Sequence, residues 1–465
     1  MPDTALLTPP FGFVAAEQEA GAHPDIYYSR TSPARDALDP RVSIIIGRRG
    51  AGKTALLKHL LHQHAHRYAI QVRFDEASAF TAVLGAVSEQ ISAGQPFVPE
   101  ELAKLWELTF WGALMSNLRR SGKVDGPAVK TLDAALRSLT FGQATGPDVS
   151  RSVLDVMHSA AVGRAKLLVE LLVLARNYLT SPSFASGVAV TKNYLNAGHR
   201  AVIVIDTLDT FPLRHESMRR ALGSLLYAVE RFALGQQHPM LEIKCFLPGE
   251  VVDSLRRVGP LPVARTLQFP LHLTWTAADL LKVICWRYVY VWNDQHEHDQ
   301  FPQQGSATIS WDIEQAVRAQ VWDEIFPGIV ANAQENREDS FDFILRHSQM
   351  RPRQIIWLCN SIAEMRPQQH GRRPRAFSRD DLLRGVAAVT PKMADEMFMA
   401  YSEIYPNAIG VFEFVRGQTN VFDRASDFLA LAHKTRRVWA DSESNSPELV
   451  LKMACDMGLV GRVVE

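Results

Sequence analysis

The chain has 465 residues, of which 47% are hydrophobic and 22% are charged, with 50 basic side chains against 50 acidic ones. This composition excludes a mainly disordered chain, and the length predicts two to four domains at roughly 100 to 200 residues per domain. Zero formal net charge removes a global attraction to nucleic acid or to a membrane surface. Such a partner would have to bind a local patch.

The cysteine pattern and the absence of apolar spans both bear on location. The four cysteines lie far apart in the sequence and form no CxxC pair, which favours a reducing compartment and argues against a zinc site made of neighbouring ligands. The first residues show no basic segment followed by an apolar run, and no stretch of about 18 apolar residues occurs. We therefore expect a cytoplasmic protein with no membrane partner.

The first half of the chain begins with a flank and then alternates between strand and helix patterns. Residues 1–40, rich in proline, alanine and aspartate, are expected to pack on the domain that comes after them. A β-branched strand over 42–46 leads through a glycine-rich turn into a helix with leucines at helical spacing. The segment 69–76 predicts a second strand. From about 80 to 195 the pattern is mainly helical, which predicts a long helical insertion.

Strand character returns after this insertion. Residues 201–206 form a continuous apolar run of the type that is buried on both faces of a parallel sheet. Further strands are expected over 241–247 and 264–271. Strands that alternate with helices predict an α/β fold with a doubly wound parallel sheet over residues 41–272.

The remainder of the chain predicts helices. A helical subdomain, or lid, is expected over 273–390, with helices over 274–292, 309–326 and 351–365. A stretch rich in proline and arginine over 366–377 comes next, and Ser378 is the expected N-cap of the next helix. Residues 391–465 are expected to form a small C-terminal domain.

One motif in the chain points to specific chemistry. The octapeptide Gly47-Arg48-Arg49-Gly50-Ala51-Gly52-Lys53-Thr54 fits GxxxxGK[ST] and lies between a buried strand and a helix. Glycines at these positions let backbone N–H groups converge on phosphate oxygens, and the helix N-terminus adds positive partial charge. Lys53 would reach the β- and γ-phosphates, and Thr54 would offer its hydroxyl to Mg²⁺. The motif predicts ATP and Mg²⁺ as cofactors, bound by these eight residues.

A loop of this kind needs a carboxylate at the end of a neighbouring strand to hold the magnesium shell. Asp206 ends the apolar run over 201–206 and is the expected metal carboxylate. Asp209, three residues on, is the candidate to orient the attacking water. The alternative for Asp209 is a helix cap or a residue that supports the site from outside.

The chain resembles the AAA+/STAND group of P-loop ATPases, in particular prokaryotic members associated with phage defence. The likeness covers roughly residues 40–390 and is carried, in this order, by GRRGAGKT, IDTLDTF, LEIKCFL, LTWTAADLLKVICWRY and RPRQIIWLC. It implies an ATP-binding core, a helical lid and a winged-helix-like C-terminal part. It also implies a homo-oligomer whose assembly controls hydrolysis and whose nucleotide state controls an effector partner, with a setting in antiviral defence.

The resemblance also implies roles for single residues. Lys53 and Thr54 match the loop pair, Asp206 matches the magnesium carboxylate, and Asp209 matches the second acidic position. Arg353, next to Arg351, matches the lid arginine that reaches the γ-phosphate. Lys53, Asp206, Asp209 and Arg353 are therefore the catalytic candidates.

The sequence departs from the family pattern at two places. Thr207 stands where a typical member has its catalytic glutamate, and the segment 247–250 lacks the usual polar or basic sensor at the end of its strand. Both departures imply slow or conditional hydrolysis. Such a pattern suits a switch better than a continuous motor.

Several weaker signals have simpler alternatives. An arginine acting across a subunit boundary would have to be one of five, each of which also fits a surface ion pair: Arg219, Arg220, Arg231, Arg256 and Arg257. His59, His62 and His66 share helical spacing, but no cysteine or carboxylate completes a metal site, so a polar helix face is preferred. Phe11 and Phe13 could flank an adenine, although ordinary packing is the preferred interpretation.

Two other classes of function stay open at this level. The arginines at 366, 372, 373 and 375 could contact a phosphate backbone, as in a DNA-loading ATPase of the initiator type, although short charge runs are usually solvated. The chain could also be a scaffold that binds ATP with little hydrolysis. A small-molecule kinase is less favoured, because no motif for a second acceptor site is present.

Overall fold

The structure, a computed structural model, describes the chain except residues 1–7, 16–17, 19–30, 64–66, 75–83, 85–86, 89–90, 92–98, 140–167, 207–214, 234–237, 253–269, 296–308, 332–336, 367–375, 403, 416–424, 436–445 and 460–465. The chain divides into two compact units. The sheet unit spans Gly21–Thr274, and the helical unit combines Met1–Ala20 with Trp275–Glu465.

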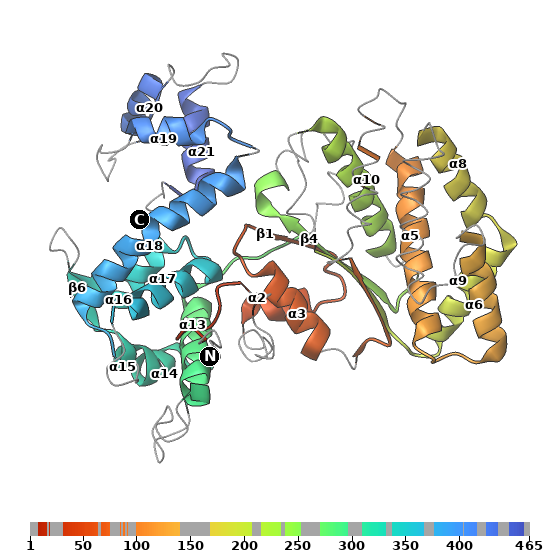
Figure 1. The fold of residues 1–465 in the computed structure, drawn as a ribbon, viewed down its shortest axis with the longest axis horizontal. Coiled ribbons are helices and arrows are strands. Elements are labelled where there is room, and N and C mark those ends of the chain that lie inside the picture. The colour runs from red at the N-terminus through yellow and green to blue at the C-terminus, as the bar shows by residue number, and fades with distance from the viewer. Residues whose placement is uncertain are drawn as a thin grey trace, which may run out of the picture. The chain divides into compact units, whose positions relative to one another are not determined.

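The sheet unit contains a five-stranded parallel sheet in the order β2-β3-β4-β1-β5 (Figure 1). The strands β1, β3 and β4 are buried at every residue, because helices cover both of their faces. This confirms the expected mixed α/β fold with a parallel sheet. The strand bounds are β1 (Ile44–Gly47), β2 (Ile70–Phe74), β3 (Ala201–Ile205), β4 (Leu241–Pro248) and β5 (Leu271–His272).

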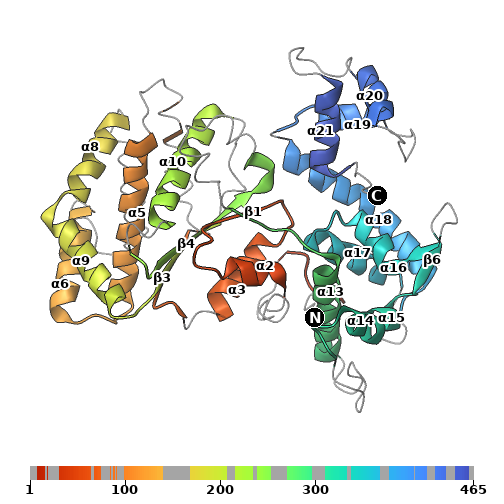
Figure 2. The ribbon, with the colours of Figure 1, turned by 180° about the vertical axis from the view of Figure 1, so that it is seen from behind.

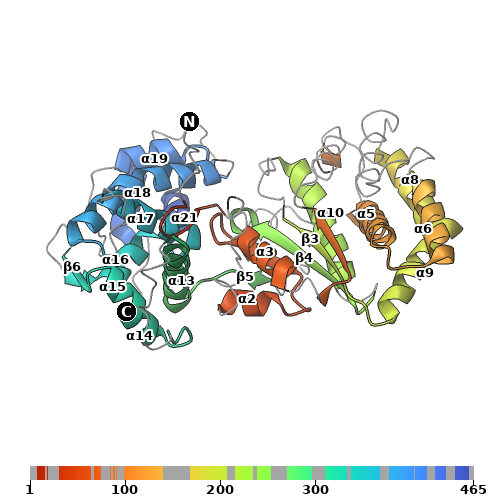
Figure 3. The ribbon, with the colours of Figure 1, turned by 60° about the horizontal axis from the view of Figure 1, so that its bottom comes forward.

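Helices lie on both sides of this sheet, as Figures 2 and 3 show. The short helix α2 (Ser32–Ala37) precedes β1, and α3 (Lys53–Gln63) follows it on one face. On the other face α5 (Pro99–Arg120) and α10 (Glu216–Ala233) pack against each other. The connection from β1 crosses the sheet to β2 at one edge. The connections that follow, from β2 to β3, from β3 to β4 and from β4 to β5, all cross the sheet in the opposite direction. Right-handed crossovers therefore place α3 opposite α5 and α10.

The neighbouring parallel strands β1 and β4 have connections that lead toward opposite edges of the sheet. The chain leaves β1 toward β2 at one edge and leaves β4 toward β5 at the other edge. Open parallel sheets bind ligands outside the carboxyl ends of strands at such a reversal. The register pairs Ile44 with Cys245 and Gly47 with Pro248, so the residues just after Gly47 and Pro248 are neighbours.

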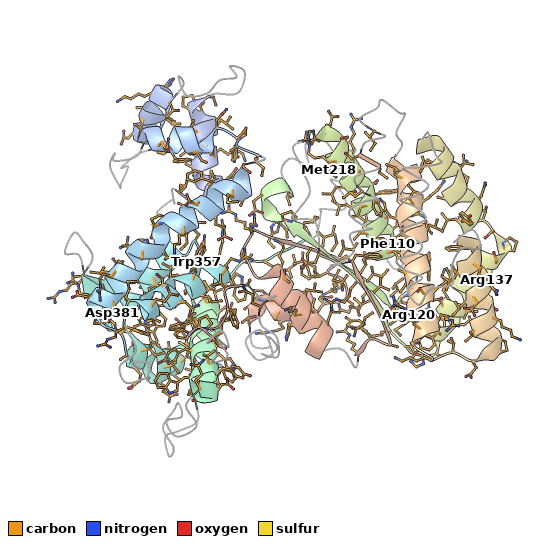
Figure 4. The ribbon with its side chains drawn as sticks, viewed as in Figure 1. Phe110, Arg120, Arg137, Met218, Trp357 and Asp381 are labelled. Atoms are coloured by element: carbon orange, nitrogen blue, oxygen red, sulfur yellow. The ribbon has the colours of Figure 1, made fainter. Side chains whose placement is uncertain are left out.

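The described part of residues 80–195 is helical, as the sequence pattern predicted. The helix α9 (Pro182–Asn196) packs closely on α5 and on α6 (Gly126–Leu139). A Cβ atom added to Gly187 would lie 2.5 Å from Sδ of Met115 in α5 and 2.7 Å from Cβ of Ala135 in α6. Phe110 of α5, labelled in Figure 4, has its ring centroid 5.2 Å from that of Phe232 in α10 and 5.9 Å from that of Phe74 in β2. The helix α8 (Leu168–Leu179) also belongs to this stretch.

The helical unit contains helices in all three expected ranges and two features that the sequence did not predict. Instead of one helix over 309–326, a short α14 leads into a π-helical turn and then α15. A two-stranded antiparallel hairpin, β6 with β7, comes next. The bounds are α13 (Ala277–Gln295), α14 (Glu314–Val317), π-helical η6 (Arg318–Trp322), α15 (Asp323–Ile325), β6 (Ile329–Ala331), β7 (Arg337–Asp339), α16 (Ser340–His347) and α17 (Pro352–Glu364).

The last helices begin at the expected cap. Ser378 forms a capping box with Asp381 at the start of α18 (Arg379–Tyr401), which confirms its predicted role. The helices α19 (Ala408–Val415), α20 (Ala425–Lys434) and α21 (Pro447–Met457) then share a small apolar core. From residue 391 on, the described residues contain no strand, so the wing of a winged helix is not among them.

Candidate functional site

The glycine-rich turn between β1 and α3 has the backbone geometry that its sequence predicts. Gly50 and Gly52 have φ angles of 80° and 90°, in the left-handed region that only glycine adopts at little cost. Gly47 has no room for a side chain either, since an added Cβ would lie 3.0 Å from Cδ1 of Leu273 and 3.1 Å from Cγ of Lys53. The three glycines therefore let the backbone turn sharply at the carboxyl end of β1.

Lys53 folds back over this turn. Its side chain is only 5% exposed, and its Nζ donates a hydrogen bond of 3.0 Å to the carbonyl oxygen of Gly47. Thr54 lies in the first turn of α3 and is half-buried. The N-terminus of this helix adds positive partial charge at the same place. The turn therefore brings an ammonium group, a hydroxyl and backbone N–H groups together.

Glu250 also reaches this turn, from the neighbouring strand. It lies two residues beyond Pro248, which pairs with Gly47, and its Oε1 accepts a hydrogen bond of 2.7 Å from the backbone N–H of Arg49. A Cβ atom added to Gly249 would lie 3.3 Å from the backbone nitrogen of Arg48, so the two segments are in close contact. Sequence reasoning missed Glu250, because the segment 247–250 stands out only by the absence of a sensor. The signal that could have found it is an acidic residue just after a buried strand.

Asp206 directly follows β3, so it lies at the carboxyl ends of the strands, as the glycine-rich turn does. The strand β4 lies between β3 and β1, which separates their backbones by about 10 Å at the usual strand spacing. Burial raises the pKa of the Cys245 thiol on β4, and the Asp206 carboxylate raises this pKa further. Asp206 is therefore close enough to the central strand β4 for its charge to act on Cys245.

Of the other catalytic candidates, Asp209 lies outside the described residues and Arg353 belongs to the helical unit. Thr207 also lies outside the described residues. Arg353 lies near the start of α17 in the helical unit, where its Nη1 is 2.9 Å from Oε1 of Glu396 in α18. The neighbouring Arg351 is buried, with 6% of its side chain exposed.

The arginines considered for a role across a subunit boundary have separate surroundings. Arg220 forms an ion pair with Glu216 one turn earlier in α10. Arg231 lies 3.8 Å from the carboxylate of Glu107. Arg219 is half-buried on α10, and Arg256 and Arg257 fall outside the described residues.

The described residues add no support for a metal site at the histidines or for a phosphate contact at the arginine run. His59 is buried in α3, the side chain of His62 and all of His66 fall outside what the structure describes, and no group of three metal-ligating side chains occurs among the described residues. Arg366 pairs with Asp381 at 3.6 Å, while Arg372, Arg373 and Arg375 are not described. No described helix has the length and apolar character to cross a bilayer.

Comparison with known proteins finds one family in part of the helical unit. Residues 306–387 match the FunZ-associated C-terminal helical domain, a stretch that contains α14 to α17 and the beginning of α18. Neither curated proteins nor solved structures gave a significant match. The match supports a distinct helical domain after the sheet unit.

Proposed function

We propose that this chain is a Mg²⁺-dependent ATPase that acts as a switch. The observation that carries the proposal is the turn Gly47–Thr54, with two glycines in left-handed conformations and the buried Lys53 folded over it. This turn lies at the strand reversal of a parallel sheet and at the N-terminus of α3. Such a place supplies N–H donors, positive partial charge and an ammonium group to a triphosphate.

The proposed reaction is attack of water on the γ-phosphate of ATP. The turn holds the phosphates, Lys53 neutralises charge on the β- and γ-phosphates, and Thr54 and Asp206 hold Mg²⁺ and its water ligands. Mg²⁺ held there would stabilise the negative charge on the phosphate oxygens. Asp209 orients the attacking water, and Arg353 senses the γ-phosphate, a role that would require it to leave Glu396.

The proposed output is nucleotide-dependent control of an effector protein by a homo-oligomer in the cytoplasm, with antiviral defence as the setting. This part rests on the family resemblance of the motifs. Arg220 and Arg231 are each engaged by a carboxylate of the same chain, which makes both less suited to reach a neighbouring subunit. Mass measurement of the purified protein with ATP, with ADP and without nucleotide tests assembly directly.

The nucleotide site is tested by Lys53→Ala. We expect the Kd for MgATP to rise at least about 100-fold, because a charge-assisted contact worth ~3 kcal/mol is lost. The melting temperature should stay within a few degrees, since the lysine ammonium serves the phosphates and not the apolar core. Titration calorimetry measures the affinity, and Lys130→Ala on the exposed side of α6 is the matched control. Wild-type ATP affinity in Lys53→Ala would falsify the site.

A second candidate is an ATP-binding scaffold with little hydrolysis. It is favoured by Thr207, which replaces the acidic residue that the resembled ATPases use at this position. In that case wild-type protein binds MgATP and releases no phosphate above the background rate. Release of phosphate that stops in Asp209→Ala while binding persists supports the enzyme instead.

A DNA-loading ATPase remains a third possibility for the same nucleotide site. It requires ATP turnover that duplex DNA stimulates, with binding that weakens steeply as salt is raised. The one described member of the arginine run, Arg366, is engaged by Asp381. Fluorescence anisotropy of labelled duplex DNA at low salt decides this point.

A further inference from the structure

We infer that Glu250 is the catalytic base that activates the attacking water. This inference rests on the proposed function and assigns one further residue to the same site. Glu250 lies just beyond the central strand β4, next to the strand that carries the glycine-rich turn. It supplies a carboxylate at a site where Thr207 cannot act as one.

The position of the terminal phosphate is set by the lysine of the turn. In a GxxxxGK[ST] loop the lysine ammonium marks the β- and γ-phosphates. Here the Nζ of Lys53 lies 3.0 Å from the carbonyl oxygen of Gly47, at the start of the turn. Gly47 pairs with Pro248 in the register of β1 with β4. The terminal phosphate is therefore expected beside the end of β4.

The Glu250 carboxylate is oriented by the same turn. Its Oε1 is held by the N–H of Arg49 at 2.7 Å, which fixes the group against the turn. Its Oε2 is buried and has no hydrogen-bond partner among the described residues. A buried carboxylate oxygen without a partner is costly, so it is suited to accept a bond from a water molecule at this site. One oxygen thus positions the carboxylate and the other accepts a proton.

The chemistry that this carboxylate would perform is general-base catalysis. Oε2 takes a proton from the water while the water oxygen forms a new bond to the γ-phosphorus. The bond from this phosphorus to the oxygen that bridges it to the β-phosphate breaks, and ADP leaves with the electron pair. The proton passes from Glu250 to solvent, so that ATP and water give ADP, inorganic phosphate and one proton.

The substitution Glu250→Gln separates this role from support of the turn. The glutamine amide oxygen still accepts the bond from the Arg49 N–H, but the side chain cannot take a proton. We expect kcat to fall by about 10²-fold or more, the usual contribution of a general base. The Kd for MgATP should stay within about threefold, or become tighter, because a negative charge next to the phosphate is removed. Glu101→Gln, whose carboxylate binds Lys104 and Arg176 on the helical insertion, is the matched control and should leave kcat unchanged.

The split between binding and turnover gives a readout that a structural role would not produce. Loss of a structural glutamate would change the Kd for MgATP and kcat together, whereas loss of a base lowers kcat alone. Phosphate release at saturating ATP measures kcat, and titration calorimetry measures the Kd. Glu250→Asp, which keeps the carboxylate on a shorter stem, should retain part of the activity. This variant also serves if Glu250→Gln fails to fold.

The outcomes separate this inference from the proposed function. Wild-type protein that binds no ATP overturns the proposed function and this inference with it. Wild-type protein that hydrolyses ATP, beside a Glu250→Gln variant of equal kcat, overturns only the role of Glu250. The same holds if the variant loses ATP binding together with turnover, because Glu250 would then support the turn. Wild-type protein that binds ATP and never hydrolyses it overturns the role of Glu250 and also favours the scaffold over the ATPase.

Discussion

At the scale of single residues, the amino end of the sheet holds a buried lysine and a buried glutamate on one strand. Lys244 of β4 is 1% exposed and donates hydrogen bonds of 2.7 Å to the carbonyl oxygens of Asp39 and Val42. Glu242, two residues earlier, accepts bonds from Arg67, Arg200 and the Tyr68 hydroxyl. These charges lie at the opposite end of the strands from the glycine-rich turn, so they belong to stability and not to the proposed site.

Burial lowers the pKa of Lys244 to about 8; the charge of Arg67 lowers it too, while Glu242 and Asp39 act against this shift. Between this pKa and the usual lysine value, the unfolded chain binds more protons at this position than the folded chain does. The contribution of Lys244 to stability therefore increases as the pH rises from 8 toward 10. Burial raises the pKa of Cys245, Cys285 and Cys359, so these thiols act in the opposite direction.

The test is therefore a comparison with Lys244→Met, which keeps the thiols. We expect the free energy of unfolding of wild-type protein, minus that of the variant, to grow by at most about 1.4 kcal/mol per pH unit in this window. Urea unfolding followed by circular dichroism measures both. The exposed Lys130→Met is the matched control. A flat difference for Lys244→Met would mean that this lysine keeps an ordinary pKa.

At the scale of elements, α17 and α18 pack so closely that one helix needs a glycine. A Cβ atom added to Gly385 of α18 would lie 2.4 Å from Cα of Ile362 in α17 and 2.6 Å from its backbone nitrogen. The hydroxyl of Ser361 donates a hydrogen bond of 2.9 Å to the carbonyl oxygen of Gly385. Because the obstacle is backbone, no rotamer change can relieve it, and the two helices would have to move apart.

Gly385→Ala should therefore destabilise the helical unit, although alanine is the better helix former. We expect a loss of about 1–3 kcal/mol in the free energy of unfolding, the usual cost of overpacking. Gly328→Ala is the matched control in the same unit, since nothing lies within 4 Å of an added Cβ there. Denaturant unfolding of both variants checks this, and equal stability would show that the helices can separate without cost.

Elements defined by local pattern could be predicted from the sequence. The apolar runs gave β1, β3 and β4 with bounds that differ by at most two residues, and the cap at Ser378 could be inferred from local chemistry alone. The hairpin β6–β7 was missed because its strands, of three residues each, are too short to show a period.

The site was predictable only where one continuous segment builds it. The glycines and Lys53 lie in a single motif, so their arrangement could be anticipated. The contact of Glu250 with Arg49 depends on the register of β1 against β4, strands almost 200 residues apart. The ion pair of Arg353 with Glu396 depends in the same way on the packing of α17 against α18. Such pairings between distant segments leave no periodic signal in one sequence.

At the scale of the whole molecule, the chain contributes its first residues to the helical unit, passes through the sheet unit and returns at Trp275. The guanidinium of Arg287 donates bonds of 2.8 Å to the carbonyl oxygens of Phe11 and Phe13. Asn360 binds the N–H of Phe11 and the carbonyl oxygen of Gly12, both at 2.9 Å. The segment around Phe11 is therefore a structural part of the helical unit, although the whole sheet unit separates it in sequence from Trp275.

The ring of Phe11 is 1% exposed and packs among three aromatic rings, with centroid distances of 5.1 Å to Tyr288, 6.1 Å to Phe326 and 6.5 Å to Phe377. A ring enclosed in this way has no face left for an adenine. The packing interpretation of Phe11 is thus the one that the structure supports. Experiments in solution can decide between packing and adenine contact. Loss of a packing residue lowers stability, whereas loss of an adenine contact lowers the affinity for ATP.

We expect Phe11→Ala in the full chain to lower the stability of the helical unit by about 3–5 kcal/mol, the cost of removing a buried aromatic side chain. The affinity for MgATP should change by less than threefold under conditions where the protein stays folded. Denaturant unfolding and titration calorimetry on the same samples measure the two effects. Phe11→Leu, which refills most of the volume, should recover most of the stability. If the leucine variant were stable and yet bound ATP ten times more weakly, Phe11 would be a nucleotide contact, because only a lost ring face could then account for the difference.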